Sequence, residues 1–100
     1  MSINAAHHRR TMQKDILETI RQFQNGELRL AGLLDRLWAQ IHDLPQEPSA
    51  DLEKLEDLWT DIEIAYAQAS ADNQTTLAPI QAAEVERAIE RMTEILRRAL

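Results

Sequence analysis

The chain has 100 residues, of which 44% are hydrophobic and 28% charged, and its formal net charge is −6. This length fits a single domain, and the composition is that of a folded globular protein. The chain has no cysteine, which excludes disulfides, thiolate metal sites and cysteine nucleophiles. It also has no run of 18 apolar residues and no apolar leader, so we expect a soluble cytoplasmic protein that does not enter a membrane.

Apolar residues recur at helical spacing in four segments, and no strand-like alternation competes with them. The predicted helices cover about 11–24, 28–44, 50–70 and 79–99. An earlier start of the first helix is the alternative, since Asn4 and Thr11 are both possible N-caps. Four amphipathic helices joined by short links predict an all-α fold, an antiparallel four-helix bundle.

One helical domain over 11–100 is therefore expected, and 1–10 is expected to be a flexible N-terminal segment. Helix-ending and helix-starting residues mark most of the boundaries. Gly26 suits the left-handed position after a helix C-terminus, and Pro45 ends the second helix. Ser49 is the expected N-cap of the third helix, and Pro79 is acceptable in the first turn of the fourth.

The core is predicted to be aliphatic, because only 4% of the residues are aromatic. Its members are Met12, Ile16, Ile20, Phe23, Leu30, Leu33, Leu34, Leu37, Ile41, Leu44, Leu52, Leu55, Leu58, Trp59, Ile62, Ala65, Tyr66, Ala69, Val85, Ala88, Ile89, Met92, Ile95, Leu96 and Ala99. Trp38 and Trp59 fall at the edges of their stripes, where an indole N–H can reach a partner.

The negative charge is concentrated in the middle of the chain. Nine acidic residues lie between 43 and 72: Asp43, Glu47, Asp51, Glu53, Glu56, Asp57, Asp61, Glu63 and Asp72. Lys54 is the single base there, so this segment carries −8, whereas 1–42 carries +2 and 73–100 is neutral. Such a field repels phosphate backbones and attracts basic surfaces, so we expect a basic protein partner and no direct binding of nucleic acid.

The outer face of the third helix is the predicted partner-binding site. Steps of about 100° per residue place seven residues on that face. They are Glu53, Glu56, Asp57, Thr60, Asp61, Glu63 and Ile64. Like charges four residues apart cost helix stability, and Ile64 adds nothing to the core, so the pattern suggests an apolar anchor inside an acidic rim. The alternative is a solvated acidic face that keeps the protein soluble.

Nothing in the sequence indicates catalysis or metal binding. The histidines are His7, His8 and His42, and they do not form a ligand motif such as His-Glu-x-x-His. No phosphate-binding glycine loop or nucleophile motif is present. We therefore expect a protein that is not an enzyme, with no catalytic residue, no metal and no cofactor.

A resemblance to a known group rests on three runs of core residues. They are Ile16-Leu17-x2-Ile20-x2-Phe23-x2-Gly26, Leu33-Leu34-x2-Leu37, and Leu58-Trp59-x2-Ile62-Glu63-x2-Tyr66-Ala67. Over about residues 12–70 this pattern resembles small helical bacterial immunity proteins encoded beside polymorphic toxins, as in contact-dependent growth inhibition and colicin D-type systems. The resemblance implies a helical bundle whose acidic surface plugs the basic active site of a toxin, often an RNase or DNase.

Our functional expectation is thus an immunity protein that binds a cognate, basic nuclease toxin and acts as a monomer. The alternative is a self-associating structural or adaptor bundle without a toxin partner. That alternative needs a second apolar face, and the off-stripe apolar residues Leu17, Leu28 and Ile64 are scattered in the sequence. A small transcriptional regulator is a third possibility, but the arginines of the second and fourth helices are interspersed with acids.

Overall fold

The computed structural model describes the backbone of residues 2–44, 50–71 and 77–99, and the side chains of 10–44, 51–71 and 77–98. Over these ranges the chain forms four helices and no strand. The helices are α1 (Ser2–Gln24), α2 (Leu30–Asp43), α3 (Ala50–Ala71) and α4 (Pro79–Ala99). The all-α class and the four helices are therefore confirmed, whereas the predicted roles of Pro45 and Ser49 lie outside the described residues.

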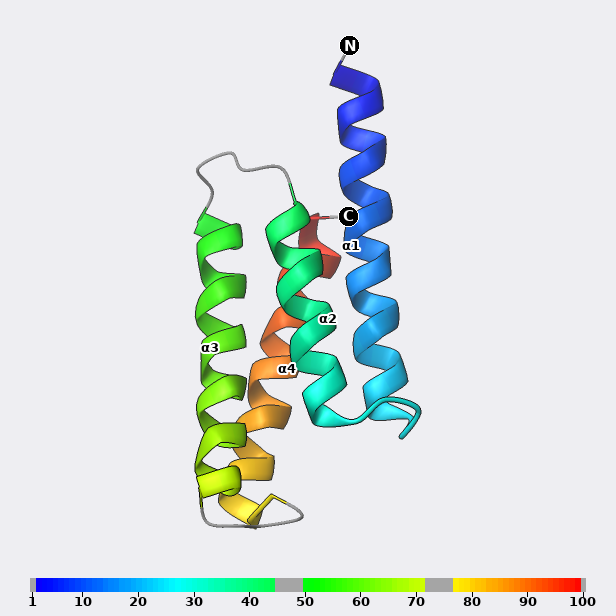
Figure 1. Cartoon of the computed structure of the whole chain (residues 1–100). Helices are drawn as coiled ribbons and strands as arrows, with labels where there is room; N and C mark the ends of the chain where they lie inside the picture. Colours follow the sequence, from blue (N-terminus) through cyan, green and yellow to red (C-terminus); the bar gives the residue numbers. More distant parts are fainter. Residues whose placement is uncertain (1, 45–49, 72–76, 100) are drawn as a thin grey trace.

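The start of α1 corrects a predicted boundary. The helix begins at Ser2 rather than at residue 11, and its N-terminal end extends beyond the other helices in Figure 1. The prediction relied on the apolar stripe, which begins at Met12. A stripe marks the turns that are buried, but a helix that has formed extends into neighbouring residues at little cost. The expected flexibility of residues 1–10 stays a prediction.

The turn after α1 has the geometry predicted for Gly26. Its φ is +78°, in the left-handed region that a residue without Cβ adopts freely. The N–H of Gly26 donates to the carbonyl of Phe23 at 3.1 Å, and the N–H of Glu27 donates to the carbonyl of Gln22 at 2.8 Å. These two bonds form a Schellman motif, which satisfies carbonyls at the end of α1 and reverses the chain.

The four helices surround one aliphatic core (Figure 1). In the described part of the chain, close approach occurs between α1 and α2, α2 and α3, α3 and α4, and α4 and α1, but not across the diagonals. The residues of this core are Ile16, Ile20, Leu33, Leu34, Leu37, Ile41, Leu44, Leu55, Leu58, Ile62, Ala65, Val85, Ala88, Ile89, Met92, Ile95 and Leu96. Each was predicted to be in the core.

Tyr66 is the clear error in the predicted core. Its side chain is 38% exposed, because it lies at the edge of the apolar stripe of α3, where the neighbouring helices cover it incompletely. Leu17 and Leu28, which fall off the predicted stripes, are partly buried and pack against the core. Ala99 was also predicted to be buried, but its side chain lies outside the described residues.

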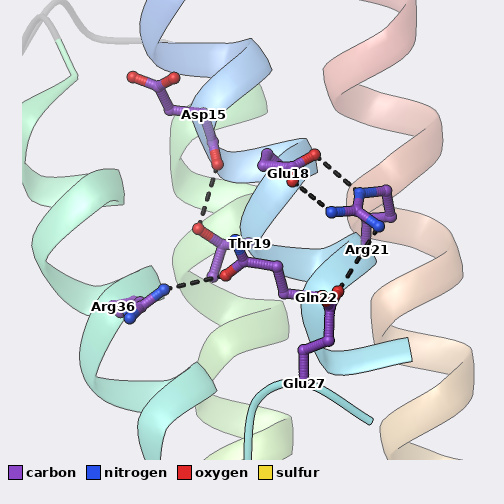
Figure 2. Close-up of polar contacts among 7 residues, drawn as sticks. All are labelled: Asp15, Glu18, Thr19, Arg21, Gln22, Glu27 and Arg36. Atoms are coloured by element: carbon purple, nitrogen blue, oxygen red, sulfur yellow. Dashed lines mark hydrogen bonds and ion pairs between the residues drawn. The ribbon is translucent and has the colours of Figure 1, made fainter. Parts of the chain in front are cut away.

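Polar contacts tie the end of α1 to the following turn and to α2 (Figure 2). Arg21 donates two hydrogen bonds to the carboxylate of Glu18, at 2.8 and 2.5 Å, and lies 3.6 Å from the carboxylate of Glu27. The bonds from Arg21 lower the pKa of Glu18, and the same contact raises the pKa of Arg21. Arg36 of α2 donates to the side-chain carbonyl of Gln22 at 2.9 Å, so Arg36 faces α1.

Candidate functional site

The predicted site lies on α3, which forms because apolar residues return every three or four positions. Five of these residues, Leu55, Leu58, Ile62, Ala65 and Ala69, are buried. Asp51 and Glu53 lie in the first turn, where a negative charge interacts favourably with the helix dipole. The remaining acids of the helix are too far from its N-terminus for this effect.

All seven predicted partner-binding residues lie at the surface of α3. Glu56 is half-buried, and the other six are exposed: Glu53, Asp57, Thr60, Asp61, Glu63 and Ile64. The side chain of Ile64 is 50% exposed. The Thr60 hydroxyl donates to the backbone carbonyl of Glu56 at 3.0 Å, so its proton is used within the helix and its oxygen stays available as an acceptor.

Most of these carboxylates lack a basic partner within the chain. Among the described residues, no ion pair joins Glu53, Asp57, Asp61 or Glu63 to a basic side chain. Glu56 differs, since one of its carboxylate oxygens lies 3.9 Å from Nε2 of His42 on α2. The unpaired carboxylates leave a negative field that is directed into the solvent.

A groove between α3 and α4 contains Asp61 and Ile64. It is lined by Lys54, Leu58, Asp61, Ile64, Glu84, Arg87, Ala88 and Arg91. The apolar floor is buried, whereas Arg87 and Arg91 of α4 and Lys54 of α3 are exposed. The acidic surface of α3 therefore ends at basic side chains on this side, and the positive charge beside Asp61 offsets part of its field. The sequence could not show this, because it depends on how α4 packs against α3.

On the opposite side of α3, aromatic rings lie between α2 and α3. The ring of Trp38 is 4.5 Å from that of Trp59 and 3.8 Å from that of His42, measured between ring centres. Nε1 of Trp59 donates to the backbone carbonyl of Leu34 at 2.9 Å. This bond confirms the prediction that the indole N–H of a tryptophan at the edge of its stripe finds a partner. Nδ1 of His42 lies 2.8 Å from the carbonyl of Trp38. Trp38 is nevertheless 48% exposed, so it is a surface residue.

Acidic side chains flank these rings. Asp35 precedes Trp38 by three positions on α2, and Glu63 and Tyr66 follow Trp59 by four and seven positions on α3. Residues at these spacings share one side of a helix. We call this surface the aromatic–acidic strip. It consists of Asp35, Trp38, His42, Glu56, Trp59, Glu63 and Tyr66.

Helical periodicity does not predict this strip, although the sequence contains one signal of it. Three of the four aromatic residues of the chain belong to it, and the fourth is Phe23. On α3, acids and aromatics alternate along one row: Glu56, Trp59, Glu63 and Tyr66. Periodicity alone places the two aromatics of that row in the core and its two acids on the outer face. The contribution of α2 was not visible from the sequence.

No metal site is apparent in the part of the chain that the structure describes, since no three His, Asp or Glu side chains come together there. His7 and His8 lie outside the described side chains. The expectation that the chain holds no metal or cofactor and is not an enzyme stays a prediction.

Comparison of the chain with protein-family models, with curated proteins and with solved structures finds no match. Within the described ranges, none of the helices combines the length and the apolar character needed to cross a membrane. The surface of α3 and its neighbours is therefore the feature of the molecule that bears on its function.

Proposed function

We propose that this chain is an immunity protein that binds a basic nuclease toxin and blocks its active site. The interface consists of the seven surface residues of α3: Glu53, Glu56, Asp57, Thr60, Asp61, Glu63 and Ile64. The observation that supports the proposal is that four of these carboxylates are exposed and have no basic partner among the described residues. Exposed unpaired acids leave a negative surface that fits a phosphate-binding cleft.

The mechanism of inhibition is steric and electrostatic. A nuclease holds the phosphates of its substrate with Lys and Arg side chains. The five carboxylates of this interface take the place of those phosphates, and Ile64 packs against apolar atoms at the edge of the cleft. Long-range attraction speeds association, and salt slows it by screening the charges. This action needs no catalysis and no cofactor, and it takes place in the bacterial cytoplasm with the protein as a monomer.

The fold belonging to this proposal is an antiparallel four-helix bundle. Contacts between α2 and α3 support it. Leu34 contacts Trp59, and His42, later in α2, lies near Glu56, which is earlier in α3. The colours of the helices in Figure 1 agree, because the last residues of each helix lie at the same end of the bundle as the first residues of the next. A nuclear Overhauser contact between the end of α2 and the start of α3 would test the arrangement.

The experiment that tests the proposed function uses the toxin domain encoded next to this chain in its genome. The variant Asp57→Lys/Asp61→Lys reverses two exposed charges and leaves the core intact. We expect it to weaken binding by about 2 kcal/mol or more, the size of an interface hot spot. A matched control is Glu90→Lys/Glu94→Lys, which reverses two exposed acids on α4. Equal affinity of the α3 variant and the unmodified protein would show that the site is misplaced.

The groove between α3 and α4 supports a second candidate function, the self-associating bundle. Its acids and bases, including Asp61, Arg87 and Arg91, form no ion pairs with one another in the described part of the chain. A surface with unpaired charges of both signs can complement a second copy of itself across a two-fold axis. Light scattering on a sizing column distinguishes the two functions, because the immunity protein is expected to elute as an 11.5 kDa monomer.

A further inference from the structure

We infer that the aromatic–acidic strip between α2 and α3 binds an arginine side chain of a basic protein partner, with Trp38 as the anchor. This inference deepens the proposed function, since it assumes that the partner is basic. The proposed function places the interface on the outer face of α3, whereas this inference places the strongest contact at the edge of that face, next to α2. The observation that carries it is the position of the aromatic residues. A chain with four aromatics leaves Trp38 and Tyr66 exposed at one edge and exposes no aromatic elsewhere in its described part.

The ring of Trp38 is held in place by its neighbours. It contacts the ring of Trp59, which is fixed by its hydrogen bond to Leu34, and it also contacts the ring of His42. His42 is in turn restrained by contact with the backbone carbonyl of Trp38. An aromatic side chain that is already ordered loses little entropy on binding, and this is a property of interface hot spots.

The charge around these rings selects a cation. Three acids border the aromatic rings: Asp35 and Glu63 are exposed, and Glu56 is half-buried. His42 is the one basic residue of the aromatic–acidic strip. The nearby arginine and lysine side chains do not neutralise these acids, because they have other partners or face other helices. Arg36 of α2 bonds to Gln22 on α1, and Lys54 lines the groove toward α4. A cation on the ring face of a tryptophan is attracted by the ring, and carboxylates beside the ring accept charge-assisted hydrogen bonds from it.

Arginine fits this surface better than lysine does. A guanidinium is planar, so it can stack on an indole ring while its N–H groups donate to carboxylates at the edge. An ammonium is a compact, strongly hydrated charge that gives up more hydration to reach the same position. The strip therefore predicts a preference for arginine over lysine, which a uniform negative field would not produce.

The test is an NMR titration of the ¹⁵N-labelled full chain at low salt, with hexa-arginine as the probe. We expect saturable shifts of the indole N–H signals of both tryptophans and of the amides of Asp35 and Glu63. The variant Trp38→Ala should weaken binding about five- to tenfold, in line with the loss of a cation–π contact. Because Trp38 is half-exposed, this variant is expected to fold, and an unchanged amide spectrum away from the strip checks that it does. Hexalysine should bind several-fold more weakly than hexa-arginine.

The matched control is Ile80→Ala on α4, which shortens the most exposed large apolar side chain among the described residues. It should leave the affinity unchanged. The inference is overturned if Trp38→Ala binds as tightly as the unmodified chain, if the peptide does not saturate, or if shifts appear only at Glu53 and Asp57. It is also overturned if the indole signals change with protein concentration alone, since the strip would then contact a second copy of the chain. The peptide requires no toxin, so failure of the strip and failure of the proposed function are separate results.

Discussion

The indole Nε1 of Trp59 donates a hydrogen bond to the backbone carbonyl of Leu34, 2.9 Å away on the neighbouring helix. Within α2 the same carbonyl is in position to accept the N–H of the residue four positions later. A carbonyl oxygen has two lone pairs, so it can accept both bonds without disturbing the helix. The bond joins the half-buried surfaces of α2 and α3 and holds the ring on which Trp38 rests.

Replacing Trp59 with phenylalanine removes this hydrogen bond and keeps most of the ring packing. We expect Trp59→Phe to lower the free energy of unfolding by about 1–2 kcal/mol, from the lost bond and the smaller ring. Urea denaturation followed by circular dichroism measures the change. Tyr66→Phe is the matched control, because Tyr66 is exposed and should tolerate loss of its hydroxyl at no measurable cost. If both variants are equally stable, the hydrogen bond contributes nothing to the packing of α2 on α3.

Gly26 provides a second test, at the turn that follows α1. Its φ of +78° is strained for any residue with a Cβ, although an added Cβ would meet no atom within 4 Å. The cost of Gly26→Ala is therefore a backbone cost of about 1 kcal/mol, visible as a lower urea midpoint. Gly26→Asn should cost less, because asparagine tolerates the left-handed region better. Equal losses in the two variants would mean that the turn can rearrange.

Sequence periodicity predicted the helices well where packing determines them. The apolar rows of α3 and α4 identified the buried residues from Leu55 to Leu96, because burial and helical spacing depend on the same positions. It failed at the start of α1, which precedes the apolar stripe that begins at Met12, and at Tyr66, which lies at the edge of its row.

The position of the seven site residues at the surface of α3 also followed from helical spacing, but their surroundings did not. Arg87 and Arg91 line the same groove as Asp61 only because α4 packs against α3, and Trp38 meets Trp59 only because α2 does. Both arrangements bring together segments far apart in the sequence. A helical projection of α3 alone therefore overstated how uniform the acidic face is.

The contact between Glu18 and Arg21 predicts a pH effect with a defined sign. The hydrogen bonds from Arg21 lower the pKa of Glu18 below its ordinary value of 4.5. Ionised Glu18 therefore favours the folded state at any pH above that value, and the benefit is lost as the pH falls through the lowered pKa. Both side chains are exposed, so we expect the effect to appear in the titration of Glu18 and only weakly in stability.

An NMR titration of the Glu18 side chain measures this pKa directly. In Arg21→Gln the donor that lowers the pKa is absent, and we expect the midpoint to rise toward 4.5. The control Glu27→Gln removes only the longer contact to Arg21, at 3.6 Å, and should leave the pKa of Glu18 low. A midpoint that does not move in Arg21→Gln would contradict the assigned cause.

The basic side chains beside Asp61 should slow association with a basic toxin if the proposed function is correct. Arg87→Gln/Arg91→Gln removes two positive charges from the edge of the acidic surface and leaves the carboxylates in place. We expect the association rate with the toxin to rise about two- to fivefold at low salt, with the difference shrinking as salt screens the field. Stopped-flow tryptophan fluorescence measures the rate, and Arg97→Gln/Arg98→Gln at the end of α4 controls for the change in net charge. An accelerated dissociation in Arg87→Gln/Arg91→Gln would instead mean that these arginines contact the partner, which would extend the interface across the groove.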